Sequence, residues 1–159
     1  MGTPARMAAA LVFAIATATI LGALAFEHLG GYAACPLCLQ QRYAYYFAVP
    51  ASALALLLLA RGNALSLARI LLILIALAFL ANAVAGIYHA GVEWKWWAGP
   101  GECAGAFDLE WSEGGIADTP LVRCDEASWR FLGLSFAGWN AVISAALAGL
   151  AAYGAAGRR

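Results

Sequence analysis

Four long stretches of this chain contain no Asp, Glu, Lys or Arg, and they cover residues 7–26, 43–60, 70–91 and 131–157. Roughly 20 helical residues span a hydrocarbon core ~30 Å thick, so each stretch is long enough to cross a bilayer. Hydrophobic residues make up 64% of the chain and charged residues 11%, against about 45–50% and about 25% in soluble domains. The sequence therefore predicts an all-α membrane protein, with four transmembrane helices in one domain of 159 residues.

The first stretch has a second interpretation. Arg6 precedes its apolar run, and the small residues of "ALA" at Ala23–Ala25 follow it, an arrangement typical of a cleaved secretory signal. The run is longer than the ~7–15 residues usual in such signals, which favours a retained helix. Cleavage would leave the placement of the later loops unchanged.

The distribution of charge predicts the orientation of the bundle. Four helices place both termini on the side of the short loop "RGNALSLAR", and this side holds Arg6, Arg61, Arg69, Arg158 and Arg159 but no acids. Basic residues in short loops stay cytoplasmic. We therefore expect cytoplasmic termini, and outward-facing loops at about 27–42 and 92–130 that carry all nine acids. The net charge of zero gives no indication of nucleic-acid binding.

All four cysteines lie in the outer segments, where disulfides persist. Pro36 suits the first position of a helix, so we expect Cys35 near the N-cap and Cys38 in the first turn. Unpaired N–H groups and the helix dipole there favour a thiolate, which we assign to Cys38. Arg42 lies one turn later on the face of Cys38, where its permanent charge can support a thiolate or an anionic ligand.

The depth of this cysteine pair points to an electron acceptor dissolved in the lipid. The apolar run begins at Tyr43, five residues after Cys38, so the dithiol should lie at the outer membrane surface within reach of a quinone. His89 ends the third stretch at a similar depth. An imidazole there can hydrogen-bond a quinone carbonyl or move a proton; the alternative is an interfacial histidine without a role.

Other uses of the cysteines fit the sequence less well. A c-type haem site needs a histidine directly after the second cysteine, and the chain has Leu39 there. Zinc held by all four cysteines is disfavoured, because the wide spacing of Cys103 and Cys124 does not form a second zinc knuckle. A membrane scaffold with two static disulfides remains an alternative, and four cysteines allow three pairings. A bridge within the long, glycine-rich outer segment would be exposed, and exposed disulfides exchange with partner thiols.

Three motifs carry a family resemblance: "CPLCLQQR" at 35–42, "YHAGVEW" at 88–94 and "CDEASWRFLGLSFAGWN" at 124–140. Together with four helices and one cysteine pair in each outer segment, they resemble the DsbB family over nearly the whole chain. DsbB proteins are inner-membrane disulfide-forming oxidoreductases of bacteria. The resemblance implies a quinone cofactor, ubiquinone in the first place and menaquinone as the alternative.

The resemblance also implies a reaction sequence. A reduced, DsbA-like periplasmic protein of thioredoxin fold would attack Cys103 of a Cys103–Cys124 disulfide. Cys124 would then form a bond to Cys35, and Cys38 would be released as a thiolate facing the quinone.

The motif positions extend the resemblance to the quinone site, where Arg42 and His89 match the family's residues. Gln41 stands where some members carry Glu, which argues against an acid-dependent proton step at that position. A member dedicated to one oxidase, or a quinone-linked reductase working in the opposite direction, fits the same motifs.

Overall fold

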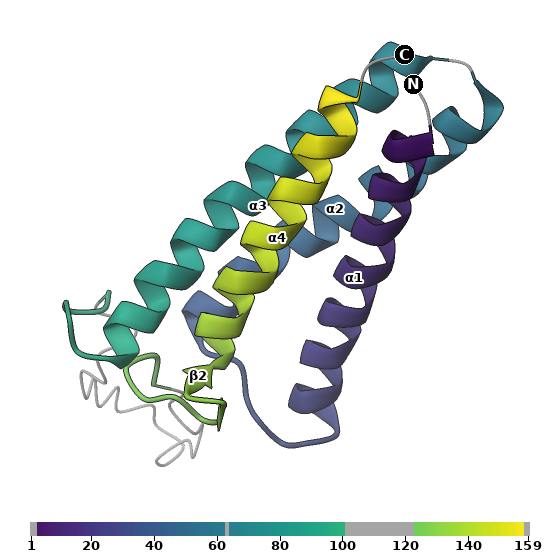
Figure 1. The fold of residues 1–159 in the computed structure, drawn as a ribbon. Helices are drawn as coiled ribbons and strands as arrows, with labels where there is room; N and C mark the ends of the chain where they lie inside the picture. Colours follow the sequence, from purple (N-terminus) through teal and green to yellow (C-terminus); the bar gives the residue numbers. More distant parts are fainter. Residues whose placement is uncertain (1–2, 63, 101–122, 158–159) are drawn as a thin grey trace, which may run out of the picture.

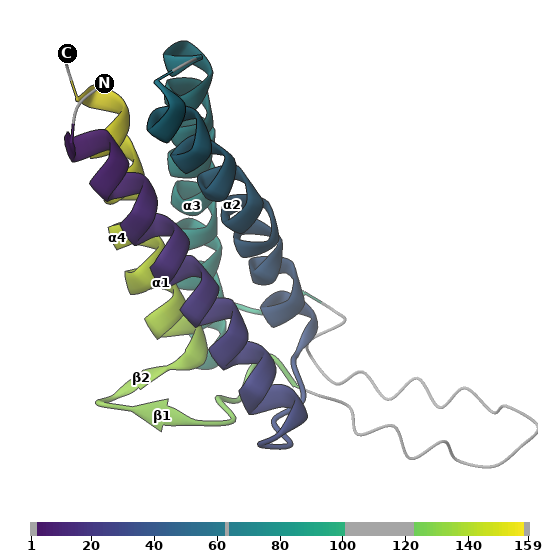
Figure 2. The same ribbon diagram turned by 90° about the vertical axis from the view of Figure 1, so that its right-hand side faces the viewer.

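The computed structural model describes residues 3–62, 64–100 and 123–157. Its elements are α1 (Thr3–His28), α2 (Pro36–Arg61), α3 (Leu65–Glu93), β1 (Arg130–Phe131), β2 (Leu134–Ser135) and α4 (Phe136–Ala156). All four helices are long and apolar enough to cross a membrane, which confirms the predicted four-helix membrane bundle. The helices run up and down, and both ends of the chain lie at the end of the bundle opposite β1 and β2 (Figures 1 and 2).

The start of α2 follows from its sequence. Pro36 occupies the beginning of the helix and Cys35 is the N-cap, with its sulfur accepting a hydrogen bond from the Cys38 N–H, as the sequence predicted. The helix ends before Gly62, whose φ of 67° is the left-handed conformation that commonly terminates helices. The CPLC motif is thereby fixed at one end of a rigid helix.

The last helix begins later than the charge-free stretch that predicted it. Residues 130–135 form an antiparallel hairpin in which Arg130 pairs with Ser135. Its two turn residues, Leu132 and Gly133, both have positive φ, as tight hairpins require. Ser135 then caps α4 by accepting a hydrogen bond from the Gly138 N–H at 3.2 Å. The lack of charged residues predicted only an apolar stretch here. The hairpin turn and the Ser135 cap determined where the helix starts.

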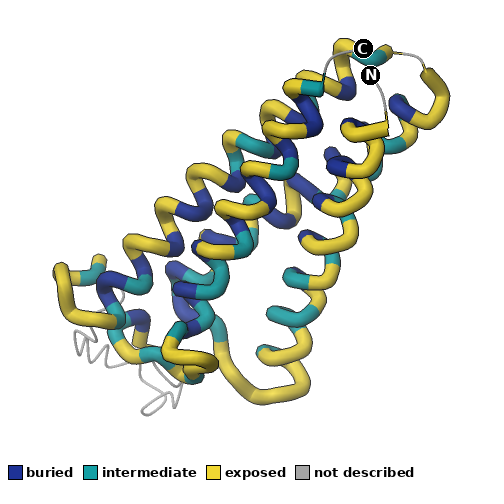
Figure 3. The backbone as a smooth tube through the Cα atoms, viewed as in Figure 1, coloured by how far each residue is buried: buried dark blue, intermediate teal, exposed yellow. Residues whose placement is uncertain are grey.

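Small residues bring the helices close together. A Cβ added to Gly86 of α3 would lie 3.0 Å from Ala141 of α4, and one added to Gly154 of α4 would lie 2.7 Å from the Cβ of Ala8 in α1. Close approach at small residues is the usual packing of helices in lipid. Large apolar side chains such as Leu77 and Ile87 are more than half exposed, and the outward faces of the helices are exposed along their length (Figure 3). These faces suit contact with lipid.

An aromatic cluster holds the end of α3. Trp97 stacks on Tyr88 with ring centroids 5.9 Å apart, and its Nε1 donates a hydrogen bond to the Tyr88 carbonyl at 2.9 Å. A Cβ on Gly91 would lie only 2.1 Å from the Trp97 ring, so the ring can lie over the helix only because residue 91 is glycine. This packing fixes the helix end that carries His89.

Candidate active site around the CPLC dithiol

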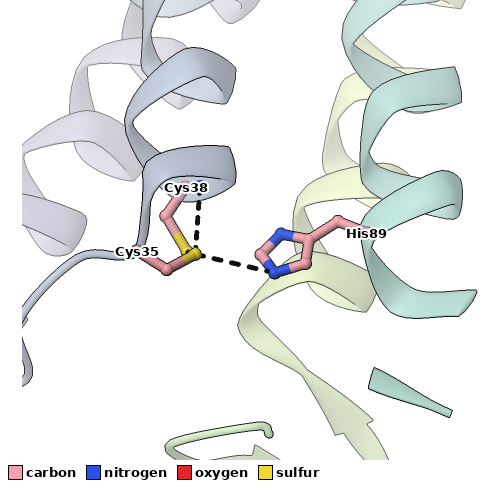
Figure 4. Close-up of side chains that lie close together, drawn as sticks. All are labelled: Cys35, Cys38 and His89. Atoms are coloured by element: carbon pink, nitrogen blue, oxygen red, sulfur yellow. Dashed lines mark hydrogen bonds between the residues drawn. The ribbon is translucent and has the colours of Figure 1, made fainter. Parts of the chain in front are cut away.

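Cys35 and Cys38 lie together at the start of α2. Their sulfurs are 2.7 Å apart, and the Cys38 N–H donates to the Cys35 sulfur at 3.2 Å (Figure 4). Cys35 is 3% exposed and Cys38 is half-buried. Two cysteines at this separation need little movement to form a disulfide.

His89 approaches the dithiol from α3. Its Nε2 lies 3.6 Å from the Cys35 sulfur (Figure 4), and its Nδ1 lies 2.9 Å from the Gln41 amide nitrogen. An amide nitrogen can only donate, so Nδ1 accepts and a neutral imidazole carries its proton on Nε2, facing Cys35. The Gln41 oxygen accepts from the Asn140 amide at 2.5 Å, which is consistent with this orientation of the glutamine.

The donors at this site converge on Cys35. The hydrogen bond that the two thiols share holds the pKa of the Cys35 thiol below its usual range, and His89 acts in the same direction, while burial of the sulfur opposes both. The sequence assigned the stabilised thiolate to Cys38. In the structure the first-turn N–H points back to the N-cap residue, so the stabilised sulfur is that of Cys35.

The sulfurs of Cys35 and Cys38 and a ring nitrogen of His89 lie within 4.8 Å of one another, close enough for three ligands of a metal ion. Zn–S bonds of about 2.3 Å in a tetrahedron, however, hold two sulfurs more than 3 Å apart. The observed separation of 2.7 Å therefore favours dithiol chemistry at this position.

Arg42 lies one turn beyond Cys38 and is paired with an acid of another helix. Its Nη1 donates to Glu27 Oε2 at 2.5 Å, and the two side chains are 12% and 23% exposed. Glu27 stands near the end of α1, so the ion pair connects α1 to α2. Sequence reasoning identified Arg42 but gave no indication of Glu27 as its partner.

A cavity of about 440 Å³ lies beside the dithiol, a volume typical of small-molecule sites. Its walls are mostly apolar and include Phe26, Trp129 and Phe136, whose rings pack with centroids 5.1 to 5.8 Å apart. Polar groups reach it from all sides of the dithiol: Cys35, Cys38, Gln41, Arg42, His89 and Glu93. The predicted site residues Cys35, Cys38, Arg42 and His89 thus share one cavity.

The fold places Cys124, which is distant in sequence, next to the dithiol. It is 1% exposed and packs with Cys35 and Leu37, with Cys38 against this cluster. Cys124 is disulfide-bonded, and Cys103, its predicted partner, lies outside the described residues. The two cysteine pairs of the sequence therefore meet at Cys35 and Cys124.

Ion pairs fix the segment next to Cys124. Asp125 Oδ2 forms ion pairs with Lys95 Nζ at 2.5 Å and with Arg123 Nη2 at 3.0 Å. Arg123, with Lys95, holds the pKa of the Asp125 carboxyl well below its usual range. The pairs connect the segment after α3 to the segment before β1.

Comparison with known proteins identifies the family. Residues 5–154 match the family described as "Disulfide bond formation protein DsbB". The chain belongs to the DsbB family. It is 34% identical over 144 residues to "Disulfide bond formation protein B" of Marinobacter nauticus, an alignment that covers 83% of this chain and 80% of that protein. No solved structure matches the chain. This DsbB-family chain is accordingly a multi-pass membrane protein with disulfide oxidoreductase activity.

The DsbB-family bundle also contains a buried polar network that sequence reasoning missed. The Asn140 oxygen accepts from the Tyr45 hydroxyl at 2.7 Å, and the Asn82 amide donates to the Ser144 hydroxyl at 2.9 Å. Through Gln41 this network is continuous with His89. The available signal was Asn82 and Asn140 inside stretches otherwise without strongly polar residues, since such residues in a membrane usually face a partner or a site.

Proposed function

We propose that this chain re-oxidises a DsbA-like protein of thioredoxin fold by dithiol–disulfide exchange and passes the electrons to a membrane quinone. The observation that carries the proposal is the position of the Cys35–Cys38 dithiol, which lines an apolar cavity and packs with Cys124. A thiol relay needs both neighbours, a second cysteine pair and an electron acceptor.

In the first step, the thiolate of the reduced partner attacks Cys103 of a Cys103–Cys124 disulfide and forms a mixed disulfide, releasing Cys124 as a thiolate. Cys124 then attacks Cys35 of a Cys35–Cys38 disulfide, and Cys38 leaves as a thiolate. The packing of Cys124 against Cys35 supports this step, because thiol–disulfide exchange requires contact between the sulfurs.

When the second partner thiol resolves the mixed disulfide, Cys103 is released as a thiolate. Cys103 then attacks Cys124 of the Cys124–Cys35 bond, which re-forms the Cys103–Cys124 disulfide and leaves the first pair reduced. Re-forming the Cys35–Cys38 disulfide transfers two electrons and two protons to the quinone. A quinone head group suits the cavity because Phe26, Trp129 and Phe136 supply aromatic walls. Arg42 and His89 supply donors for its oxygens. DsbA-type proteins have potentials near −120 mV, so their re-oxidation needs an acceptor stronger than glutathione; a respiratory quinone, ubiquinone or menaquinone, meets that requirement.

The proposal places the chain in the bacterial inner membrane with the dithiol on the periplasmic side. Both chain ends lie at the end of the bundle opposite the start of α2 (Figure 1), and the start of α2 carries Cys35 and Cys38. Arg61 at the end of α2 and Arg69 near the start of α3 lie at the same end of the bundle as the chain ends, and basic short loops stay cytoplasmic. A reduced periplasmic partner would then meet Cys103 and Cys124 directly.

The test is anaerobic quinone reduction by the purified chain in detergent, with a soluble quinone analogue and a reduced DsbA-like protein. We expect quinone absorbance to fall only when partner, chain and Cys38 are all present. No reduction, together with disulfides that the reduced partner cannot open, would instead support a scaffold with static bridges.

A further inference from the structure

Glu93 is a buried acid with no role in the steps above. It is the last residue of α3, its side chain is 5% exposed, and it lines the cavity beside the dithiol. Its Oε1 lies 3.9 Å from His89 Nε2. Its Oε2 is buried and has no hydrogen-bond partner among the described residues. A buried polar atom without a partner is costly, which points to a ligand or a proton as the missing partner.

The groups around Glu93 connect it to the reaction. Cys35 from the start of α2 and His89 from its own helix face it, together with Arg130 of β1 and the Ser135 hydroxyl of β2. Cys38 lines the same cavity as Glu93. The Cys35 sulfur and Glu93 Oε1 therefore both lie within 4 Å of the His89 ring nitrogen that carries the proton.

We propose that Glu93 is the proton donor of this site, which delivers the proton of its carboxyl through Oε2 to a quinone oxygen in the cavity and is then re-protonated from water. This inference rests on the proposed function. It explains why an acid is kept in an apolar cavity, and why Gln41 can be an amide: the acid lies on α3 instead.

The step balances in atoms and charge. The dithiol loses two electrons and two protons as the sulfur–sulfur bond forms, and the quinone gains both as it becomes a quinol. Glu93 gives the proton of its carboxyl to one quinone oxygen, and the Nε2–H of His89 faces the carboxylate that remains. A proton from water, to which the dithiol has released its own protons, then restores the carboxyl of Glu93. It is unchanged after each turnover.

The experiment measures single-turnover quinone reduction by the anaerobically reduced full chain, using a short-chain ubiquinone analogue across a range of pH. Glu93→Gln keeps the shape of the side chain but cannot donate a carboxyl proton. We expect the rate to fall about 10²-fold, in the range usual for loss of a general acid, with little change in the quinone concentration that half-saturates the rate. In the wild type, ionisation of the Glu93 carboxyl should lower the rate as pH rises. The rate of Glu93→Gln should lack this pH dependence.

The comparison variant is Glu126→Gln, the same chemical change at an acid that also lines the cavity but whose side chain is 66% exposed, and it should keep the ionisation in the pH profile that Glu93→Gln loses. Glu93→Asp keeps a carboxyl and should retain the ionisation at a reduced rate. In Glu93→Ala, added formate should restore part of the lost rate.

Failure of the inference and failure of the proposed function give different results. If the wild type does not reduce the quinone, the proposed function is wrong and this inference falls with it. If the wild type reduces the quinone but Glu93→Gln has the same rate and pH profile, only the role of Glu93 is wrong. The role of Glu93 is also wrong if two results occur together: formate does not restore the rate of a folded Glu93→Ala, and Glu93→Asp behaves like Glu93→Gln.

Discussion

The two ends of the bundle are built differently. At the dense end, near the chain termini, buried alanines of α1, α3 and α4 pack with Leu59 and Leu72, and Gly154 leaves no room for a Cβ beside Ala8. At the other end the helices enclose a cavity of about 440 Å³ with a dithiol, an ion pair and a buried acid. The dense end can supply much of the stability, and the hollow end supplies the chemistry at the cost of packing contacts.

The largest effect should come from the dithiol itself. Cys38→Ser keeps the size of the side chain but cannot form a disulfide, so we expect quinone reduction to fall to background. The thermal unfolding midpoint in detergent should stay close to that of the wild type, because Cys38 is not part of the dense end. A folded variant with full activity would contradict the relay, and loss of stability without loss of activity would support a structural role.

Arg42→Ala tests the ion pair at the cavity wall. We expect the apparent KM for the quinone to rise about tenfold, since a hydrogen bond to a charged group is worth about 1.5–3 kcal/mol, with a smaller change in kcat. Steady-state kinetics with a soluble quinone give both values. Arg61→Ala is the control, because Arg61 is exposed at the opposite end of α2. An unchanged KM in Arg42→Ala would remove this arginine from the quinone site.

Gly154→Ala tests the dense end. The new Cβ would lie 2.7 Å from the Cβ of Ala8, so α1 and α4 must separate, at a cost of about 1–3 kcal/mol. Gly149→Ala in the same helix is the matched control, since no atom lies within 4 Å of its added Cβ. Thermal unfolding should show a lower midpoint for the first variant alone, with the KM for quinone unchanged in both. Equal midpoints would mean that the dense end does not depend on this contact.

The smallest effect concerns the Cys35 thiolate. Because its pKa is lowered, the thiolate should be present at neutral pH and disappear only on acidification, well below the ~8.5 of a free cysteine. The ultraviolet absorbance of thiolate in the reduced protein measures this titration. His89→Phe removes one donor, so its midpoint should move upward. A midpoint at the free-cysteine value in the wild type would contradict the convergence of donors on Cys35.

Much of this protein follows from local sequence. Charge-free stretches of about 20 residues predicted the four helices, because a bilayer excludes charge and forces backbone groups to pair within a helix. Pro36 predicted the start of α2 and the cap at Cys35, because both depend on adjacent residues. The same local reasoning placed the start of the last helix too early, since the hairpin turn at Leu132 and Gly133 is also free of charge.

The tertiary structure decided how the site is assembled. The contacts of His89 with Cys35, of Glu27 with Arg42, and of Cys124 with the dithiol each join segments that are distant in sequence. They depend on how each helix is rotated and packed against its neighbours, which the apolar stretches leave open because those stretches are apolar on every side. For the same reason the sequence does not distinguish Glu93 from the other acids of the outer loops. Only the packing of α3 against the hairpin makes it a buried carboxyl beside the reacting sulfurs.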